Sequence, residues 1–389
     1  MTVNYLLRSN PVAIVGVYNT KQARSLPGET TTSIIAEAIL GAIEDSGLPA
    51  EAVNGIAIHA FEPSLSPNYY CSMLGGRSCW TASWTSGIAG ISIAASAIAA
   101  GYCDVAVVAA GQAGMYGDHK STAPWTRPES EFIFPFGLYT AVEFALPARR
   151  YMHIYGTKRE SLAEVAATVR NNGSKNPGAV YYGKGPFTRE DILNSRPICD
   201  PFNLLDCSMT SEGGCAVVLA RTDRIADTKH RPVYVVGLGV ETMGQGYTRP
   251  PVWEQYGNIG KWAADRAFEQ SGLARKDVDV FELYDAFSFE VIRQFETYGF
   301  CGPGEGGDFV MGGRIHLDGE YPICTDGGTM SFSHAGAAQT LQKVIAGALQ
   351  LQGRCGDRQI PDAKVSISAI AGVGALANDV ALLSVEPTA

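Results

Sequence analysis

Apolar and polar residues follow two periods along this chain, and the same order of segments occurs twice. The apolar run "PVAIVGV" (residues 11–17) returns as "PVYVVGL" (residues 232–238). Further along, "AIEDSGLPAEAVNGIAIHAF" (residues 42–61) returns as "AFEQSGLARKDVDVFELYDAF" (residues 267–287). Each copy predicts a strand, a loop, an amphipathic helix with a Ser-Gly-Leu cap, an acidic turn and a buried strand. The pattern therefore predicts an internal duplication.

A second pair of repeated segments extends the duplication. The small-residue helix pattern "SGIAGISIAASAIAAG" (residues 86–101) precedes the strand "CDVAVVAAG", and "HAGAAQTLQKVIAGALQLQG" (residues 334–353) precedes "KVSISAIAGVG". Continuous runs of Ala and β-branched residues are typical of strands that helices cover on both faces. Two such halves packed together predict an α/β protein with a five-layer α-β-α-β-α core.

The repeat also sets the expected domain organisation. We predict an N-terminal half at residues 1–230 and a C-terminal half at residues 231–389. Residues from about 112 to 200 interrupt the repeat with a loop-rich, aromatic insertion over the site. The repeat aligns His59 with Tyr284, each at the C-terminal end of a predicted strand. Ligands bind at this end of the strands in open α/β sheets, so chemistry is expected at both positions.

Composition narrows the classes of function. The chain has 389 residues, 46% hydrophobic and 18% charged, and its net charge of −9 without a Lys/Arg run argues against nucleic-acid binding. The start "MTVNYLLRSNPVAIVGV" lacks the pattern of a signal peptide, and no apolar stretch reaches ~18 residues, so no membrane span is predicted. Nine cysteines without CxxC spacing predict a cytoplasmic protein with no metal site.

Four motifs carry a resemblance to a known family. They are "WTSG" (residues 84–87), "YDAFSFE" (residues 284–290), "DGGTMSFSHAGAAQ" (residues 326–339) and "AIAGVG" (residues 369–374). With them the chain resembles the thiolase superfamily, specifically its sterol-carrier or lipid-transfer-protein thiolase-like branch. The resemblance covers nearly the whole chain and implies the duplicated five-layer thiolase-like fold.

Two of the four motifs depart from the family pattern. The family's first motif is Cys-x-Ser-Gly, and Trp84 stands in the place of its nucleophilic cysteine. The C-terminal Cys-x-Gly loop has lost its cysteine acid/base, although Gly372 and Gly374 keep the turn. Claisen condensation through an acyl-cysteine needs both groups. Cys79 is the nearby thiol, but its spacing places it on the preceding segment, so thiolysis is not expected.

The retained groups suit the stabilisation of an enolate. His334 follows a Gly-rich loop and precedes a predicted helix, so it can donate a hydrogen bond to an oxyanion; the other interpretation is a structural histidine. Each oxyanion donor typically contributes roughly 3 kcal/mol. Turns and a helix N-terminus predict further backbone donors at Trp84, Ser86, Gly372 and Gly374. The candidate substrate contacts are His59, Ser333 and Gly336.

Tyr284 takes the place of the usual Asn or His in the strand-end motif. Its phenol can remove the proton of a β-hydroxyl group or return one to a carbanion. The other interpretation is a tyrosine that caps a buried strand. Asp285 should face the other way along a regular strand, which predicts a structural carboxylate.

These groups together favour a retro-aldol cleavage of a β-hydroxyacyl thioester. Such a reaction needs no nucleophile, metal or redox cofactor, so no cofactor is predicted beyond the CoA of the substrate. The resemblance implies steroid side-chain CoA thioesters as substrates, cleaved to a ketone or aldehyde and a short acyl-CoA. Related aldolases can carry a second tyrosine where this chain has His334, which leaves the division of labour between Tyr284 and His334 open.

The resemblance also implies partners. We expect a homodimer, which a small OB-fold and zinc-ribbon protein joins to form a heterotetramer, and the apolar segment at residues 86–111 favours the dimer. Two other functions fit the sequence. One is an acyltransferase component of a complex, and the other is a non-catalytic scaffold or lipid-binding subunit.

Overall fold

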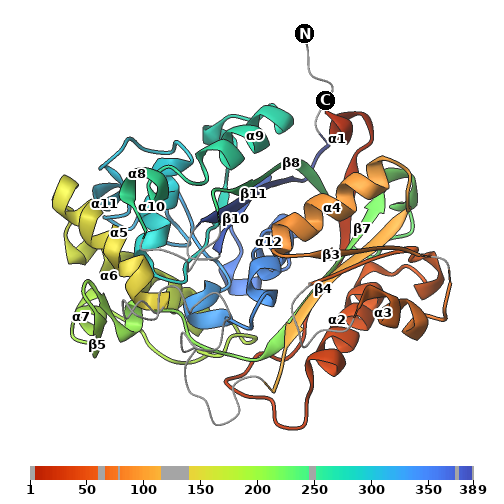
Figure 1. Cartoon of the computed structure of the whole chain (residues 1–389), viewed down its shortest axis with the longest axis horizontal. Coiled ribbons are helices and arrows are strands. Elements are labelled where there is room, and N and C mark those ends of the chain that lie inside the picture. Colours follow the sequence, from red (N-terminus) through yellow and green to blue (C-terminus); the bar gives the residue numbers. More distant parts are fainter. Residues whose placement is uncertain are drawn as a thin grey trace.

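The computed structural model of this chain describes residues 5–59, 66–77, 79–114, 140–244, 251–372 and 376–387. Its central element is a nine-stranded mixed sheet in the order β3-β2-β4-β7-β1-β8-β11-β10-β9 (Figure 1). The strands of this sheet are β1 (Val12–Asn19), β2 (Gly55–His59), β3 (Trp80–Trp84), β4 (Val105–Gln112), β7 (Gly213–Arg221), β8 (Val233–Thr242), β9 (Val280–Glu282), β10 (Val365–Gly372) and β11 (Ala377–Ser384).

The strand order is mirrored about the contact between β1 and β8. These two strands pair antiparallel, with Ala13 opposite Tyr234. On one side β2 pairs parallel with β3 and β4, and on the other β9 pairs parallel with β10. The counterpart of β3 is a single parallel bridge between Phe281 and Ile323. The duplicated α/β fold predicted from the sequence is confirmed, whereas the boundary at residue 230 stays a prediction.

Four long helices add the remaining layers: α2 (Thr31–Ser46), α4 (Gly87–Ala99), α9 (Lys261–Ser271) and α12 (Ala338–Leu351). The outer helices are α2, which packs on β1, β4 and β7, and α9, which packs on β8 and β11. The inner helices α4 and α12 each contact strands of both halves and lie near the centre of Figure 1. The order of the layers is therefore α2, the strands of the N-terminal half, α4 with α12, the strands of the C-terminal half, and α9. These are the five layers expected from the sequence.

The two inner helices meet at their N-termini. The backbone N–H of Gly87 donates to Thr340 Oγ1 over 2.7 Å, which ties the first turn of α4 to that of α12. A Cβ atom at Gly87 would lie 2.3 Å from the backbone nitrogen of Leu341, so this close approach requires glycine. The N-cap of α4 is Ser86, whose hydroxyl accepts from the N–H of Ala89 over 3.1 Å.

The part of the chain between β4 and β7 differs from the loop-rich insertion that we expected. Its described residues form the helices α5 (Thr140–Tyr155), α6 (Arg159–Ser174) and α7 (Arg189–Leu193). These helices form because apolar residues recur at helical spacing, and α5 buries Phe144, Ala148 and Tyr151. The shorter elements are α1 (Leu6–Ser9), α3 (Pro67–Met73), α8 (Trp253–Tyr256), α10 (Ser288–Thr297), α11 (Gly306–Phe309), β5 (Pro197–Cys199), β6 (Phe202–Asn203), a π-helical turn η8 (Gly328–Phe332), and 3-10 turns at Ala50–Ala52, Leu204–Asp206, Thr222–Arg224, Arg275–Asp277 and Gly356–Arg358.

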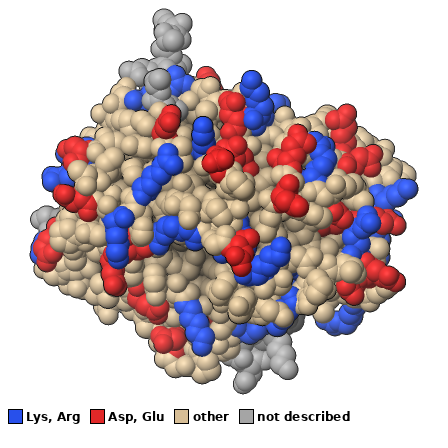
Figure 2. Space-filling view, turned by 180° about the vertical axis from the view of Figure 1, so that it is seen from behind, with Lys and Arg blue, Asp and Glu red and all other residues tan. Residues whose placement is uncertain are grey.

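Positive and negative side chains are mixed on the face of the molecule that Figure 2 displays. Figure 2 shows Lys and Arg interspersed with Asp and Glu on the face opposite to that of Figure 1. This face therefore lacks the single-sign basic field that binding of a phosphate backbone requires. Among the described helices, none combines the length and the apolar character needed to cross a bilayer.

A buried ion pair holds the strand-end motif against α12. Asp285 and Lys343 approach to 2.6 Å, and both side chains are almost completely buried. The Asp285 carboxylate also accepts the backbone N–H groups of Thr329 and Met330, at 2.8 and 3.0 Å. Asp285 is thus the structural carboxylate that we expected, and it fixes the Gly-rich loop.

Replacement of Lys343 by methionine should destabilise the protein strongly. The change leaves Asp285 as an uncompensated buried charge, which typically costs about 3–5 kcal/mol. Chemical denaturation of Lys343→Met gives this free energy of unfolding, with Lys364→Met at an exposed lysine as the control. Equal stability of the two variants would contradict the assigned role of the pair.

Candidate active site

Trp84 ends β3, and its indole fills the core beside the N-terminus of α4. The side chain is 2% exposed. It packs on Gly90, where a Cβ atom would lie 3.0 Å from the ring. The position that resembles a nucleophile site therefore holds a tightly packed indole, which has no nucleophilic group.

His59 lies beside this indole at the end of β2. It pairs with Trp84 in the parallel register, and the two rings meet edge to face with their centroids 4.9 Å apart. Burial lowers the pKa of His59 to about 4. A hydrogen bond with the Thr85 backbone raises this pKa, but the effect of burial is larger. His59 is therefore a neutral imidazole near pH 7, able to make hydrogen bonds but not to supply a positive charge.

A buried carboxyl from the other half reaches the turn after Trp84, and the sequence analysis missed it. The Ser86 hydroxyl donates to Asp379 on β11, and the N–H of Glu241 donates to the same carboxyl over 3.3 Å. Burial raises the pKa of Asp379 to about 6, although these two hydrogen bonds lower it. The available signal was the polar pair Asn378-Asp379 in an otherwise apolar strand.

Buried hydroxyl groups hold the loop that carries His334. The backbone N–H of His334 donates to Ser211 Oγ over 2.7 Å. Ser333 is 1% exposed; its hydroxyl donates to Gln22 Oε1 over 2.7 Å and lies 3.0 Å from Ser211 Oγ. These contacts let Ser333 orient the loop, and its role as a substrate contact stays a prediction.

The turn after His334 packs against the end of β4. Gly336 has a φ of +50°, and a Cβ atom there would lie 2.2 Å from Oε1 of Gln112. Gln112 is the last residue of β4, the strand next to β2 in the sheet. The His334 turn therefore lies at the C-terminal end of β4, on the same side of the sheet as the strand ends that carry His59 and Trp84.

Tyr284 follows the end of β9 in the C-terminal half. β9 ends at Glu282, which pairs with Ser368 of β10. Tyr284 lies two residues beyond this strand, and its place in the site stays a prediction. Tyr284 is 6% exposed, so its phenol lies in a largely dry environment.

The other predicted positions have mixed outcomes. Gly372 is the last residue of β10 and pairs with Ala377, whereas Gly374 lies outside the described residues. Cys79 lies before the first residue of β3, about 16 Å along the strand from Trp84 at ~3.3 Å per residue, and it hydrogen-bonds with Cys71. The thiol of Cys79 is thus too distant to replace a nucleophile at the turn.

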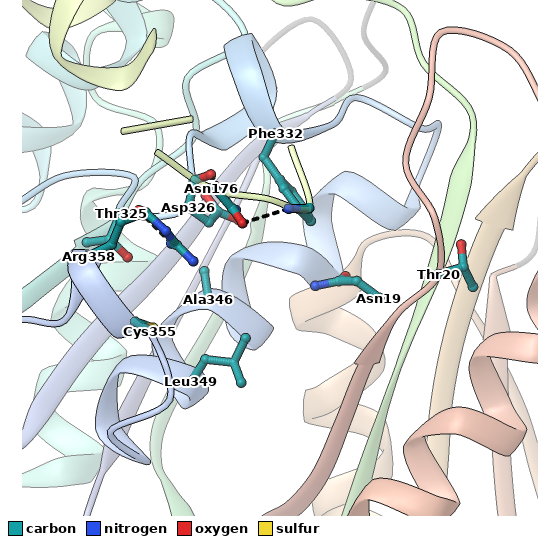
Figure 3. Close-up of a pocket in the computed structure, with 11 residues that line it drawn as sticks. Asn19, Thr20, Asn176, Thr325, Asp326, Phe332, Ala346, Leu349, Cys355 and Arg358 are labelled. Carbon is teal, nitrogen blue, oxygen red and sulfur yellow. Dashed lines mark hydrogen bonds between the residues drawn. The ribbon is translucent and has the colours of Figure 1, made fainter. Parts of the chain in front are cut away.

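A small cavity with a mixed polar and apolar lining is formed by other residues. It encloses about 160 Å³ and is lined in part by Asn19, Asp326 and Arg358. In Figure 3 the Asn176 amide donates to the backbone oxygen of Asp326, over 2.8 Å. None of the predicted site residues lines this cavity. The described residues contain no cluster of three or more His, Cys, Asp or Glu side chains that could hold a metal ion.

Comparison with known proteins places the chain among thiolase-like aldolases. The family model "Thiolase C-terminal domain-like" matches residues 258–385. The chain is 32% identical over 89% of its length to 17-hydroxy-3-oxo-4-pregnene-20-carboxyl-CoA lyase of Mycobacterium tuberculosis, covering 92% of that protein. It is 31% identical over 82% of its length to the steroid side-chain-cleaving aldolase of Thermomonospora curvata, covering 85% of it.

A solved structure described as the Ltp2-ChsH2(DUF35) aldolase is similar over almost the whole chain. The TM-score is 0.85 at 29% identity, and the match covers 96% of this chain and 97% of that one. The five layers described above are therefore shared with an aldolase structure.

Replacement of Asp379 by asparagine should change stability in a pH-dependent way. The native pKa of about 6 lies above the unfolded value of about 3.9, so the native state binds more protons in this window. The stability that Asp379 contributes is therefore present below about pH 4 and lost as the pH rises through 6. Asp379→Asn has no such loss, so its melting temperature relative to the parent should rise between pH 4 and pH 7. Asp308→Asn at an exposed carboxylate is the control, and a pH-independent difference at Asp379 would refute the assignment.

Proposed function

The chain belongs to the thiolase superfamily, in the branch that contains steroid side-chain-cleaving aldolases, and on that premise we propose the reaction that it catalyses. The protein is a retro-aldolase that cleaves a β-hydroxyacyl-CoA. The substrate is a steroid whose side chain is a CoA thioester with a hydroxyl group on the β-carbon. The products are a ketone or aldehyde and a short acyl-CoA.

The reaction proceeds without an acyl-enzyme. Tyr284, as the phenolate, accepts the proton of the β-hydroxyl group, the Cα–Cβ bond breaks, and the β-carbon leaves as a carbonyl group. The electron pair of the broken bond enters the thioester as an enolate. His334 and the backbone donors at Trp84, Ser86, Gly372 and Gly374 hold the enolate oxygen. Tyr284 then returns the proton to Cα and gives the short acyl-CoA, so the reaction involves no net oxidation or reduction.

The main observation in support of a reaction without an acyl-enzyme is the buried indole of Trp84. An acyltransferase of this superfamily needs a thiolate at the turn, and Trp84 occupies that turn with a 2% exposed ring packed on Gly90. The distance of Cys79 from the turn removes support for an acyl-enzyme route. What the turn retains is a helix N-terminus, a hydroxyl and backbone N–H groups, which suit an oxyanion.

The assembly extends the proposal. We propose a homodimer joined by a small DUF35-type OB-fold protein, and the similarity to the Ltp2-ChsH2(DUF35) aldolase supports this partner. β3 lies at one edge of the sheet, with Thr81 and Ser83 exposed, so its outer backbone edge is available to a second copy. We further propose a cytoplasmic location, because all nine cysteines are free thiols, as a reducing compartment favours.

Removal of the phenol hydroxyl should abolish most of the activity. Tyr284→Phe should fold and bind substrate normally, while kcat falls by ~10²-fold or more, a typical contribution of general acid–base catalysis. His334→Ala should lower kcat by a similar or larger factor, as loss of an oxyanion donor does. The assay follows release of ketone or aldehyde from a β-hydroxyacyl-CoA, with the DUF35-type partner present and no free CoA. Near-full activity of Tyr284→Phe, or a strict need for free CoA, would show that the proposed reaction is wrong.

Sedimentation velocity should show a dimer at micromolar concentration without the partner. The reason is the sheet-edge position of β3, which can pair with β3 of a second copy. Thr81→Pro on β3 removes a backbone N–H and should shift the equilibrium to monomer. A parent chain that sediments as a monomer would contradict this assembly.

A further inference from the structure

Tyr284 lies where the sheet can no longer pair its backbone. β9 is paired with β10 at Val280, Phe281 and Glu282, and the pairing stops two residues before Tyr284. A buried N–H and C=O without partners would each cost free energy comparable to a lost hydrogen bond. Another group must therefore satisfy this backbone.

That group is the side-chain amide of Gln294 on α10. Its Oε1 accepts the N–H of Tyr284 over 3.0 Å, and its Nε2 donates to the carbonyl oxygen of Tyr284 over 2.7 Å. The amide thus takes the place of a neighbouring strand for one residue. Gln294 is completely buried, so water does not compete for these bonds.

The orientation of the Gln294 amide is fixed by two further partners. Nε2 also donates to the backbone oxygen of Glu290 over 2.8 Å, and Oε1 also accepts from the hydroxyl of Tyr298 over 3.3 Å. The two donors and the two acceptor sites of the amide are all in use. A rotated amide would place donors against donors, so only one orientation satisfies the site.

The same chain of contacts continues to the other half of the active site. Tyr298 and Asn378 hydrogen-bond over 2.7 Å. The next residue of β11 is Asp379, which accepts from Ser86 at the N-cap of α4. One buried path therefore links the backbone of Tyr284 to the turn that follows Trp84.

We propose that Gln294 is the positioning residue for Tyr284, and that it acts with Tyr298 and Asn378 to set the distance between the phenol and the α4 turn. This inference rests on the proposed function, because it takes Tyr284 to be the catalytic base. A base must be held in hydrogen-bond reach of the proton that it removes, and displacement by about 1 Å can cost 10²-fold in rate.

Gln294→Glu tests the inference, since the side chains have the same shape. The ionised carboxylate still accepts from the Tyr284 N–H but places an oxygen against its carbonyl oxygen. We expect kcat to fall by ~10-fold or more at pH 8 with KM nearly unchanged. Burial raises the pKa of an introduced carboxyl, and the protonated form can donate as Nε2 does. The ratio of variant to parent kcat should therefore recover as the pH falls from 8 to 6.

A second glutamine gives a matched control. Gln350 on α12 is 1% exposed and clamps backbone in the same way, since Nε2 donates to the oxygen of Arg358 over 2.8 Å and Oε1 accepts the N–H of Ile360 over 2.9 Å. Gln350→Glu should lower stability without changing the pH profile of kcat. Equal losses with equal pH profiles in both variants would show that Gln294 has only a structural role.

A second variant, Tyr298→Phe, and a measurement of amide hydrogen exchange test the inference independently of Gln294→Glu. Tyr298→Phe removes one link of the path and should lower kcat at constant KM, even if Gln294→Glu fails to fold. Amide hydrogen exchange at Tyr284 should become at least ~10-fold faster in Gln294→Met, since the amide partner is lost. Unchanged exchange would overturn the inference. If Tyr284→Phe stays active, the assigned reaction fails, while the exchange rate still reports on the Gln294 contact.

Discussion

The close approach of the two inner helices at their N-termini determines the geometry of the whole site. The absence of a side chain at Gly87 allows the backbone of α4 to lie against Leu341, and the Thr340 hydroxyl bonds the first turn of α4 directly. Each helix also contacts strands of both halves, so this contact sets how the two half-sheets face one another. A side chain at Gly87 would separate the helices and, with them, the two strand ends.

The active site that we propose is consequently shared between the halves. The N-terminal half supplies Trp84 and His59 from neighbouring strands, and we propose that the C-terminal half supplies Tyr284 and His334. Rigid elements carry these groups in an interior that excludes water, where fixed donors act more strongly on a developing charge than they do in water. Under the proposed function, the turn keeps the donors that stabilise an enolate, although it holds an indole in place of a nucleophile.

Local patterns made much of this predictable from the sequence. The caps at Gly47 and Gly272 and the strand end at His59 depend on residues close in the chain, whereas the predicted strand end at Tyr284 was two residues too long, since β9 ends at Glu282. The long-range partners were not predictable. Ser86 and Asp379 are 293 residues apart, and no local periodicity reports such a contact. The Gln294 contact was hidden for another reason, because a glutamine in an amphipathic helix looks like an ordinary polar position.

Burial of α12 on all its faces has a consequence for synthesis of the chain. Nearly every residue of Ala338–Leu351 is buried. The helix α12 covers strands of the N-terminal half as well as strands of the C-terminal half, to which it belongs. At roughly 5–20 residues per second, the ~110 residues between position 230 and α12 take on the order of 5–20 s to translate. Throughout that interval the apolar side of α4 has no covering helix. A cell that produces this protein must protect the nascent N-terminal half from aggregation until translation reaches α12.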